Sequence, residues 1–347
     1  MSISTPSHQD QIVLAHGSGG TMMRDLIANY FVPAYGASEL LAGDDSATLS
    51  LPPSSNKLAF TTDSYVITPY IFPGADIGRL AIAGTVNDLA TSGATPLWLS
   101  VAFILEEGLP LDQLKTICQS IADTALEAQV TVVTGDTKVV PRGNCDGIFI
   151  NTAGVGVFTQ QQPLSGKHCL PGDKILVSGT LGDHGIAVLA SRDNLSFDTG
   201  VVSDAAPLNH LVASVLKAAP DTRCFRDPTR GGLASAINEL AMQSQTTMTI
   251  DEQSVPVNPA VRGVAELLGF DIFQVANEGK MIAVVPPNQA EAALAAMQAN
   301  PLGKDAAIIG EVSQTSGVGM PPAWVRTTLG ATRVLDMLVG EQLPRIC

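Results

Sequence analysis

Apolar residues in the first half of the chain alternate between short runs typical of buried strands and stripes typical of helices. Stretches rich in β-branched and aromatic residues predict strands at 57–67, 97–105, 130–134 and 147–158. Between them, apolar positions recur at helical spacing after Asp76, a predicted N-cap, and again over 111–126, where the stripe includes Cys118 and Leu126. This alternation predicts an αβ domain over residues 1–160.

The alternation restarts after a polar, turn-prone stretch at 160–163, which is a candidate linker. Strands are predicted at 174–177, 281–285 and 307–312, and helices at 183–191, over 208–216 and after Gly232. We therefore predict a second αβ domain over residues 161–325, and an α+β protein overall. The final segment, 326–347, ends in a tail that is expected to be flexible, because chain ends held by no sheet or helix are usually poorly ordered.

Composition narrows the class of protein. The 347 residues, 45% hydrophobic and 15% charged, are typical of a well-packed globular chain. A net charge of −14 argues against nucleic-acid binding, but not against ATP, which needs only local donors and Mg²⁺. We expect no membrane segment and no signal peptide, since no apolar run is long enough. The five cysteines are odd in number and never form CxxC, which favours free thiols in a reducing cytoplasm.

The terminal cysteine is the first candidate for chemistry. Cys347 stands beside the carboxylate that ends this sequence, two residues after Arg345. The arginine would lower the pKa of the thiol and the carboxylate would raise it. A thiol on a mobile end can reach a reaction partner, but a tolerated surface cysteine, an intermolecular disulfide and one ligand of a shared metal are alternatives.

Four aspartates lie beside a glycine or in a polar turn of the first predicted domain, namely Asp45, Asp63, Asp88 and Asp136. Carboxylates are ligands that Mg²⁺ prefers, together with waters and substrate phosphates. Asp63 and Asp136 are expected at the ends of strands, where ligands often gather in αβ sheets. Each aspartate taken alone also fits an ordinary turn or helix cap.

Glycine-rich segments supply backbone N–H groups that can approach a phosphate closely. The segment HGSGG at 16–20 contains Gly17, Gly19 and Gly20, and DPTRGG at 227–232 leads into a predicted helix whose N-terminus attracts anions. A third segment, NEGK at 277–280, supplies the carboxylate of Glu278. Plain loops and turns would look the same, and the absence of GxxxxGK[ST] and GxGxxG disfavours P-loop and Rossmann nucleotide sites.

Taken together, these segments resemble the HypE family of hydrogenase maturation proteins. The match covers nearly the whole chain in order, and the terminal PRIC makes the combination specific. It runs through HGSGG (16–20), GDDSA (43–47), TDSYVITPYIFPGADIG (62–78), GTVNDLATSGA (84–94), TGDTKVV (134–140), PGD (171–173), GDHG (182–185), DPTRGG (227–232), NEGK (277–280) and PRIC (344–347).

The resemblance implies a fold and a cofactor site. The family belongs to the superfamily of aminoimidazole ribonucleotide synthetase, selenophosphate synthetase and thiamine-monophosphate kinase, whose members have two αβ domains. Their N-terminal domains typically pair into a β-barrel shared by a homodimer. ATP and Mg²⁺ bind near the domain interface, which assigns the four aspartates to both ligands and lets the loop with Gly17, Gly19 and Gly20 close over the nucleotide.

The resemblance also implies a reaction. Cys347 would receive a carbamoyl group from the partner HypF, and ATP-dependent dehydration would convert the S-carboxamide to an S-thiocyanate. The HypC–HypD complex would accept the nitrile carbon as a cyanide ligand for the iron of [NiFe]-hydrogenase. Lys138 would neutralise the transferring phosphoryl group and Glu278 would act as the base. Ten extended tail residues reach roughly 33 Å, which is enough to visit both proteins.

Two other functions stay open from the residues alone. The same fold would serve a small-molecule kinase or synthetase in which the tail plays no part. A non-enzymatic metal carrier or scaffold would use Cys347 with a histidine such as His16, although the histidines show no metal-ligand spacing.

Overall fold

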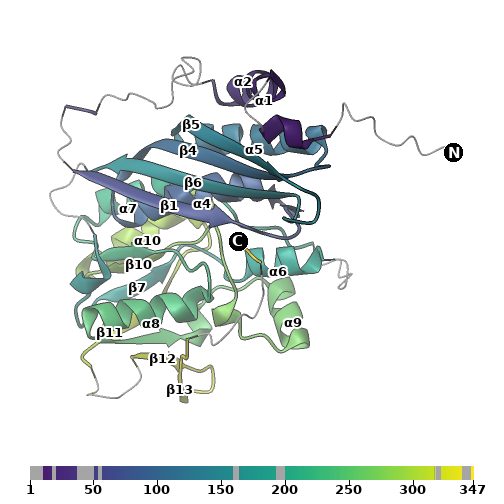
Figure 1. Ribbon diagram of the computed structural model, residues 1–347. Coiled ribbons are helices and arrows are strands. Elements are labelled where there is room, and N and C mark those ends of the chain that lie inside the picture. Colours follow the sequence, from purple (N-terminus) through teal and green to yellow (C-terminus); the bar gives the residue numbers. More distant parts are fainter. Residues whose placement is uncertain are drawn as a thin grey trace.

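The computed structural model describes residues 11–17, 21–36, 51–53, 57–158, 164–192, 200–315, 317, 322–337 and 345–347. Within these ranges the chain forms two stacked αβ domains, and the C-terminus lies between them (Figure 1). The prediction of two αβ domains is therefore confirmed.

The N-terminal domain is built on a four-stranded sheet in the order β1-β6-β4-β5, in which only β4 and β5 run parallel. Alternate residues of β4, such as Leu99 and Phe103, are buried against the helices α4 and α5, and this fixes which face of the sheet is covered. The strands are β1 (Leu58–Tyr65), β4 (Thr95–Glu106), β5 (Thr131–Val140) and β6 (Ile148–Val157), and the helices α4 (Ile77–Thr91) and α5 (Leu111–Ala128).

No described helix or strand covers the opposite face of this sheet. Phe60 on β1 is 72% exposed and Ile104 on β4 is 42% exposed, which is unusual for large apolar side chains on a sheet. An N-terminal helical segment instead packs on the covered side, where the ring of Phe31 stacks on Phe103 at 5.0 Å. It consists of η2 (Leu14–Gly17), α1 (Thr21–Leu26), η3 (Ile27–Phe31) and α2 (Val32–Tyr35), and the small β2 (Ile71–Phe72) and β3 (Ala75–Asp76) pair beside α4.

The C-terminal domain has a seven-stranded sheet in the order β13-β12-β9-β11-β7-β10-β8. Helix α8 packs on one face, and α7 and α10 on the other, so the central β7 and β10 read as continuous apolar runs. The strands are β7 (Lys174–Val177), β8 (Cys224–Arg226), β9 (Thr247–Asp251), β10 (Ile282–Val285), β11 (Ala307–Ser313), β12 (Ala323–Arg326) and β13 (Thr332–Val334). The helices are α6 (Asp183–Ala190), α7 (Asn209–Ala218), α8 (Gly232–Ser244), α9 (Pro259–Leu268) and α10 (Ala290–Gln298), with short 3-10 turns at η4 (Gly166–His168), η5 (Glu252–Ser254), η6 (Ile272–Gln274), η7 (Pro287–Gln289) and η8 (Pro301–Gly303).

One buried amide joins the two domains. Asn87 of α4 is 3% exposed, and its Nδ2 donates to the carbonyl oxygens of Ala206 (3.1 Å) and Glu278 (3.5 Å). Its Oδ1 accepts from the backbone N–H of Leu208 at 2.7 Å. Because all three partners are backbone groups of the C-terminal domain, Asn87 fixes where that domain sits on α4.

Several predicted details differ from the structure. Leu126 was expected on the buried stripe of α5, but it is 78% exposed because it lies one residue past the buried Ala125. Asp136 was expected at a strand end, but β5 continues to Val140 because it keeps pairing with β4. The C-terminal sheet also extends past residue 325, since β12 crosses that position and β13 follows it.

The apolar pattern did not predict the N-terminal helical segment, the strands β8, β9, β12 and β13, or the helices α9 and α10. Helix α9 did carry a signal, because Asn258 caps it by accepting from the N–H of Ala260 and Pro259 occupies its first position. The short strands carry too few residues for their periodicity to be read.

The N-cap of α4 gives a stability prediction. The Asp76 Oδ1 accepts from the N–H groups of Gly78 (2.8 Å) and Arg79 (3.0 Å), and the residue is 7% exposed. We expect Asp76→Ala to lower the free energy of unfolding by about 1–2 kcal/mol, because two helical donors lose their partner. Asp76→Asn keeps an acceptor and should cost less than half of that in chemical denaturation. An equal loss in both variants would show that charge, and not hydrogen bonding, makes the cap.

Candidate functional site

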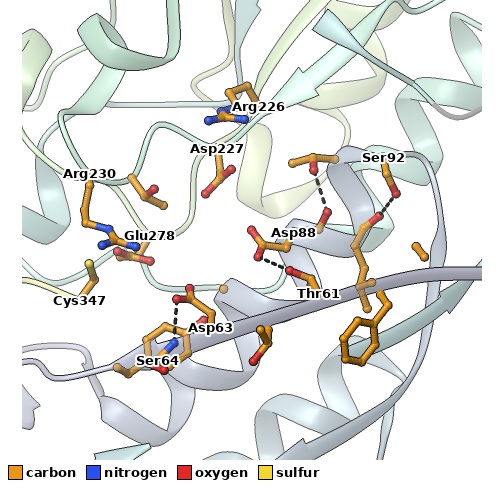
Figure 2. A pocket seen from close by; sticks show the side chains of 18 of the residues that line it. Thr61, Asp63, Ser64, Asp88, Ser92, Arg226, Asp227, Arg230, Glu278 and Cys347 are labelled. Carbon is orange, nitrogen blue, oxygen red and sulfur yellow. Dashed lines mark hydrogen bonds between the residues drawn. The ribbon is translucent and has the colours of Figure 1, made fainter. Parts of the chain in front are cut away.

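A cavity of about 590 Å³ lies between the domains. The N-terminal domain contributes β1 and α4, and the C-terminal domain contributes the segment 226–230 and Glu278 (Figure 2). Cys347, the last residue of the tail, also lines it. The cavity therefore gathers side chains from at least five separate parts of the sequence.

The N-terminal wall carries two carboxylates. Asp63 lies on β1 and accepts from the N–H of Ser64 at 2.8 Å, and Asp88 lies one residue after the interdomain Asn87. The Thr61 hydroxyl donates to Asp88 Oδ2 at 2.9 Å, which ties the helix to the strand at this point. Both carboxylates face the space between the domains (Figure 2).

The C-terminal wall begins where β8 leads into α8. Arg226, Asp227 and Arg230 line the cavity here, just before the N-terminus of α8, whose backbone N–H groups attract anions. The close packing depends on Gly232, which has φ +59°, since an added Cβ would lie 2.6 Å from the carbonyl oxygen of Phe273. Together with the two arginines, this helix end favours a phosphate group.

Glu278 is held by its backbone and not by its carboxylate. It is 4% exposed, and its N–H donates to Asp204 Oδ1 at 3.1 Å. The next residue, Gly279, lies so close to segment 203–206 that an added Cβ would be 1.7 Å from the Asp204 carbonyl oxygen. No described residue donates a hydrogen bond to Glu278 Oε1, so this oxygen is available to a ligand.

The tail enters the cavity beside Glu278. The Cys347 side chain lies next to Glu278 and Arg230 (Figure 2). Its carbonyl oxygen accepts from the N–H of Val66 at 3.2 Å, just past the end of β1. Arg345 turns away and pairs with Asp146, so the arginine beside the thiol is Arg230 and not Arg345. Among the described tail residues, 345–347, the chain is thus docked inward.

Burial and crowding of acids raise several pKa values in the cavity. Burial, with the nearby Asp227 carboxylate, raises the pKa of Asp88 to about 6. Burial also raises the pKa of Asp227, and it raises that of Glu278 well above its usual range, with Asp204 and Asp227 adding to the effect. The pKa of the Cys347 thiol is raised by burial and then by Glu278, although Arg230 opposes this. The site therefore holds a neutral thiol and a cluster of acids that a bound cation would stabilise.

The donor set fits Mg²⁺ bound jointly with a phosphate ligand. In the described part of the chain, no three His, Cys, Asp or Glu side chains are close enough to hold a metal ion by themselves. Asp63 and Asp88 nevertheless offer hard oxygen ligands in one cavity, and Mg²⁺ is commonly held by one or two carboxylates plus substrate phosphates.

The predicted site residues fall into three groups. Asp63, Asp88, Glu278 and Cys347 lie together in the cavity. Asp136 and Lys138 pair with each other at 2.9 Å on the open face of β5, each more than half exposed, and do not line this cavity. The Lys138 hydrogen bond lowers the pKa of Asp136. Gly17 ends the turn η2, and Gly19, Gly20 and Asp45 lie outside the described residues.

The prediction of site residues missed Arg226, and it included Asp227 and Arg230 only as members of the segment DPTRGG (227–232). A signal for Asp227 and Arg230 was present in DPTRGG, since a double glycine before a helix marks a close backbone approach. His184 was included only as part of GDHG (182–185) and was given no role, because a buried histidine and a surface histidine look the same in sequence.

Comparisons with known proteins agree with this geometry. Residues 43–158 match the family described as AIR synthase related protein, N-terminal domain, and residues 171–320 match its C-terminal domain. A relative from Bradyrhizobium diazoefficiens named carbamoyl dehydratase HypE is 49% identical over 335 residues, which cover 96% of this chain and 95% of the relative. The chain belongs to the HypE family.

Solved HypE structures share the whole fold. A hydrogenase maturation protein HypE in complex with ATP superposes with a TM-score of 0.92 at 46% identity, and the match covers 96% of this chain and 99% of that one. The HypE chain of a HypE–HypF complex superposes with a TM-score of 0.78 at 43% identity, covering 90% and 99%. Within the described ranges, this HypE family member has no helix with the length and apolar character of a membrane span.

The raised pKa of Asp88 predicts a stability effect that depends on pH. The folded-state value of about 6 exceeds the ordinary 3.8, so folding favours the protonated carboxyl. This contribution is complete at low pH and is lost as the pH rises from about 4 to 6. In the metal-free protein at about pH 8, Asp88→Asn should therefore raise the free energy of unfolding by up to about 3 kcal/mol.

The difference between the Asp88→Asn variant and the parent chain should vanish near pH 4, as measured by chemical denaturation across the pH range. Asp112→Asn, at an exposed position in the first turn of α5, is a matched control that should show little change. A gain that does not vary with pH would contradict the assignment to Asp88.

Proposed function

We propose that this protein is an ATP-dependent carbamoyl dehydratase of hydrogenase maturation that acts on a carbamoyl group carried by its own Cys347. The observation that carries the proposal is the position of this thiol, inside the interdomain cavity beside Glu278 and Arg230. The relatives named carbamoyl dehydratase HypE and the ATP-bound HypE structure support the reaction and its nucleotide.

The chemistry removes water from an amide. Carbamoylation of Cys347 gives an S-carboxamide, and transfer of the γ-phosphoryl group of ATP to the amide oxygen turns that oxygen into a phosphate leaving group. Loss of the two N–H protons and of phosphate then leaves an S-thiocyanate, ADP and phosphate. The released phosphate keeps the amide oxygen, so the net change in the S-carboxamide is the loss of one water.

Glu278 is the proposed base. Its carboxylate has a buried oxygen without a partner among the described residues, and it lies beside the thiol that carries the amide. A raised pKa makes the ionised carboxylate a stronger base for an N–H proton. Arg230 would stabilise negative charge on the amide oxygen as phosphate forms on it.

The opposite wall of the cavity suits the nucleotide. We propose that Asp63 and Asp88 hold Mg²⁺, with Asp45 and Asp136 as further ligands, and that the loop with Gly17, Gly19 and Gly20 closes over the phosphates. Bound Mg²⁺ would neutralise phosphate charge during transfer. Arg226, Arg230 and the N-terminus of α8 would orient the γ-phosphate toward the tail.

Lys138 needs a second copy of the chain in order to act. It projects from the open sheet face together with Ile104, its pairing partner on β4. Two such faces can close into a shared β-barrel, which would cover the exposed apolar residues of a homodimer. We propose that Lys138 reaches the partner's cavity in this dimer and neutralises the phosphoryl group there.

The partners follow from the chemistry of the tail. The solved HypE–HypF complex supports HypF as the donor of the carbamoyl group. We propose the HypC–HypD complex as the acceptor of the nitrile carbon, and a cytoplasmic location in which the five thiols stay reduced. The tail must then leave the cavity twice, once for loading and once for delivery.

Intact mass tests the main proposal. With HypF, carbamoyl phosphate and ATP, the mass should rise by one carbamoyl group, and MgATP should then remove one water. Cys347→Ala should acquire neither change, whereas Cys145→Ser, which alters the other partly exposed thiol, should behave as the parent chain. Equal modification of Cys347→Ala would refute the assignment of the carrier thiol.

Asp88→Asn separates loading from dehydration. It should still accept the carbamoyl group on Cys347, but lose dehydration by at least about a hundredfold, because a Mg²⁺ ligand is missing. Single-turnover loss of water, followed by mass, measures this step. If the variant failed in both loading and dehydration, the cause would be misfolding or damage to the surface that binds HypF.

Mixed dimers test Lys138. Neither Lys138→Ala nor Cys347→Ala should dehydrate its own tail as a pure dimer. In mixed dimers, the chain with an intact tail meets the Lys138 of the partner subunit, so water loss should return to part of the material. No recovery after confirmed subunit exchange would mean that Lys138 does not act across the dimer.

A further inference from the structure

The docked tail runs beside the extension of β1. The N–H of Val66 donates to the Cys347 carbonyl oxygen, and the N–H of Thr68 donates to that of Arg345, both at 3.2 Å. The order of these bonds is antiparallel, so the tail pairs with the backbone just past the end of β1 in the manner of a short strand. Ile346 between them is 6% exposed and packs in the core with Val188.

A buried histidine holds the middle of this segment. His184, in the first turn of α6, is fully buried, and its Nε2 lies 2.7 Å from the Ile346 carbonyl oxygen. Its Nδ1 lies 2.8 Å from the Ser203 hydroxyl. The ring edge of His184 also packs against Phe72, with the centroids 5.5 Å apart, so the imidazole cannot easily turn away.

The hydrogen bonds fix the tautomer of His184. A carbonyl oxygen only accepts, so Nε2 must carry the proton that it shares with Ile346. Nδ1 then accepts from the Ser203 hydroxyl, whose own oxygen accepts from the N–H of Ala205 at 3.1 Å. Burial lowers the pKa of His184, which favours this neutral form. From the N–H of Ala205 to the carbonyl oxygen of Ile346, each group therefore donates a hydrogen bond to the next.

We propose that His184 is a positioning residue of the dehydration reaction, which holds Ile346 and thereby keeps the modified Cys347 beside Glu278. This inference rests on the proposed function. When the tail leaves, the buried Nε2–H loses its acceptor, and an unpaired buried donor is costly. The docked state is favoured accordingly until HypF or an acceptor captures the tail.

The segment that orients His184 also orients Glu278, the proposed base. Ser203 bonds the imidazole, and the next residue, Asp204, accepts from the N–H of Glu278 at 3.1 Å. The two contacts come from adjacent residues of one segment, whose distance to Gly279 is fixed by close packing. The same segment therefore positions both His184, which holds the tail, and Glu278.

The other contacts to the tail are weaker candidates. Arg345 pairs with Asp146, but its side chain is 58% exposed, and exposed ion pairs contribute little. Arg192 donates to the carbonyl oxygens of Thr68 and Arg345, both at 3.1 Å, and is only partly buried. Among the described side chains that bond to the tail, His184 is the one that is fully buried.

Alkylation of Cys347 in the full chain tests this inference without ATP or carbamoyl phosphate. In a Cys145→Ser background, the remaining cysteines Cys118, Cys169 and Cys224 are buried and report on folding. We expect His184→Ala to raise the alkylation rate of Cys347 about tenfold while the three buried cysteines stay protected. His184→Gln, whose amide N–H can replace Nε2–H, should recover part of that protection.

The same variants should behave predictably in the reaction. His184→Ala should slow single-turnover dehydration about tenfold, leave the KM for ATP unchanged, and accept the carbamoyl group from HypF at least as fast as the parent chain. Unchanged alkylation of Cys347 in a folded His184→Ala protein would overturn the proposal. If the buried cysteines of that variant become reactive, Ser203→Ala decides, since it removes the donor to Nδ1, together with the acceptor of the Ala205 N–H, and keeps His184 in place.

Ser203→Ala should raise alkylation of Cys347 about threefold, and no change would equally overturn the role of His184. The alkylation result does not depend on the proposed function. Faster alkylation together with a parent chain that never loses water would leave the tail contact in place and refute the dehydratase activity instead.

Discussion

The site depends on how Asn87 docks the two domains. Its amide bonds three backbone groups of the C-terminal domain, and the adjacent Asp88 faces the cavity. The position of one helix residue therefore sets the distance between the carboxylates of the N-terminal wall and Glu278 on the other wall. A side chain that left any of these buried groups unpaired would cost stability and misplace the catalytic walls together.

This docking encloses charges that water would otherwise separate. Burial raises the pKa values of Asp88, Asp227 and Glu278, and the Asp227 carboxylate raises those of Asp88 and Glu278 further. Such crowding is unfavourable in the empty protein, but it creates the affinity for a cation and the basicity that a dehydration needs. Arg226 and Arg230, which precede α8, supply positive charge on the side of the cavity where phosphate would lie.

Sequence patterns predicted the two domains and some of the residues that line the cavity. Helix α4 was found from the apolar stripe after Asp76, and Asp63, Asp88, Glu278 and Cys347 were chosen from local motifs that the fold then brings together. Asp136 and Lys138 were chosen by the same logic, yet they lie on the open face, because side-chain direction along β5 depends on register and not on motif. The contact of His184 with Ile346 joins residues 162 positions apart, and no local signal encodes it.

The proposed role of the tail as both carrier and substrate sets opposing demands. Such a tail would have to be held firmly enough for Glu278 to reach the amide, and weakly enough to visit other proteins. Backbone pairing with Val66 and Thr68 is modest in strength because water can replace it at a sheet edge. The burial of Ile346 and its contact with His184 are lost only when the segment leaves as a unit. Release is therefore a single step with one buried contact at its centre, and this is the point at which a partner can control it.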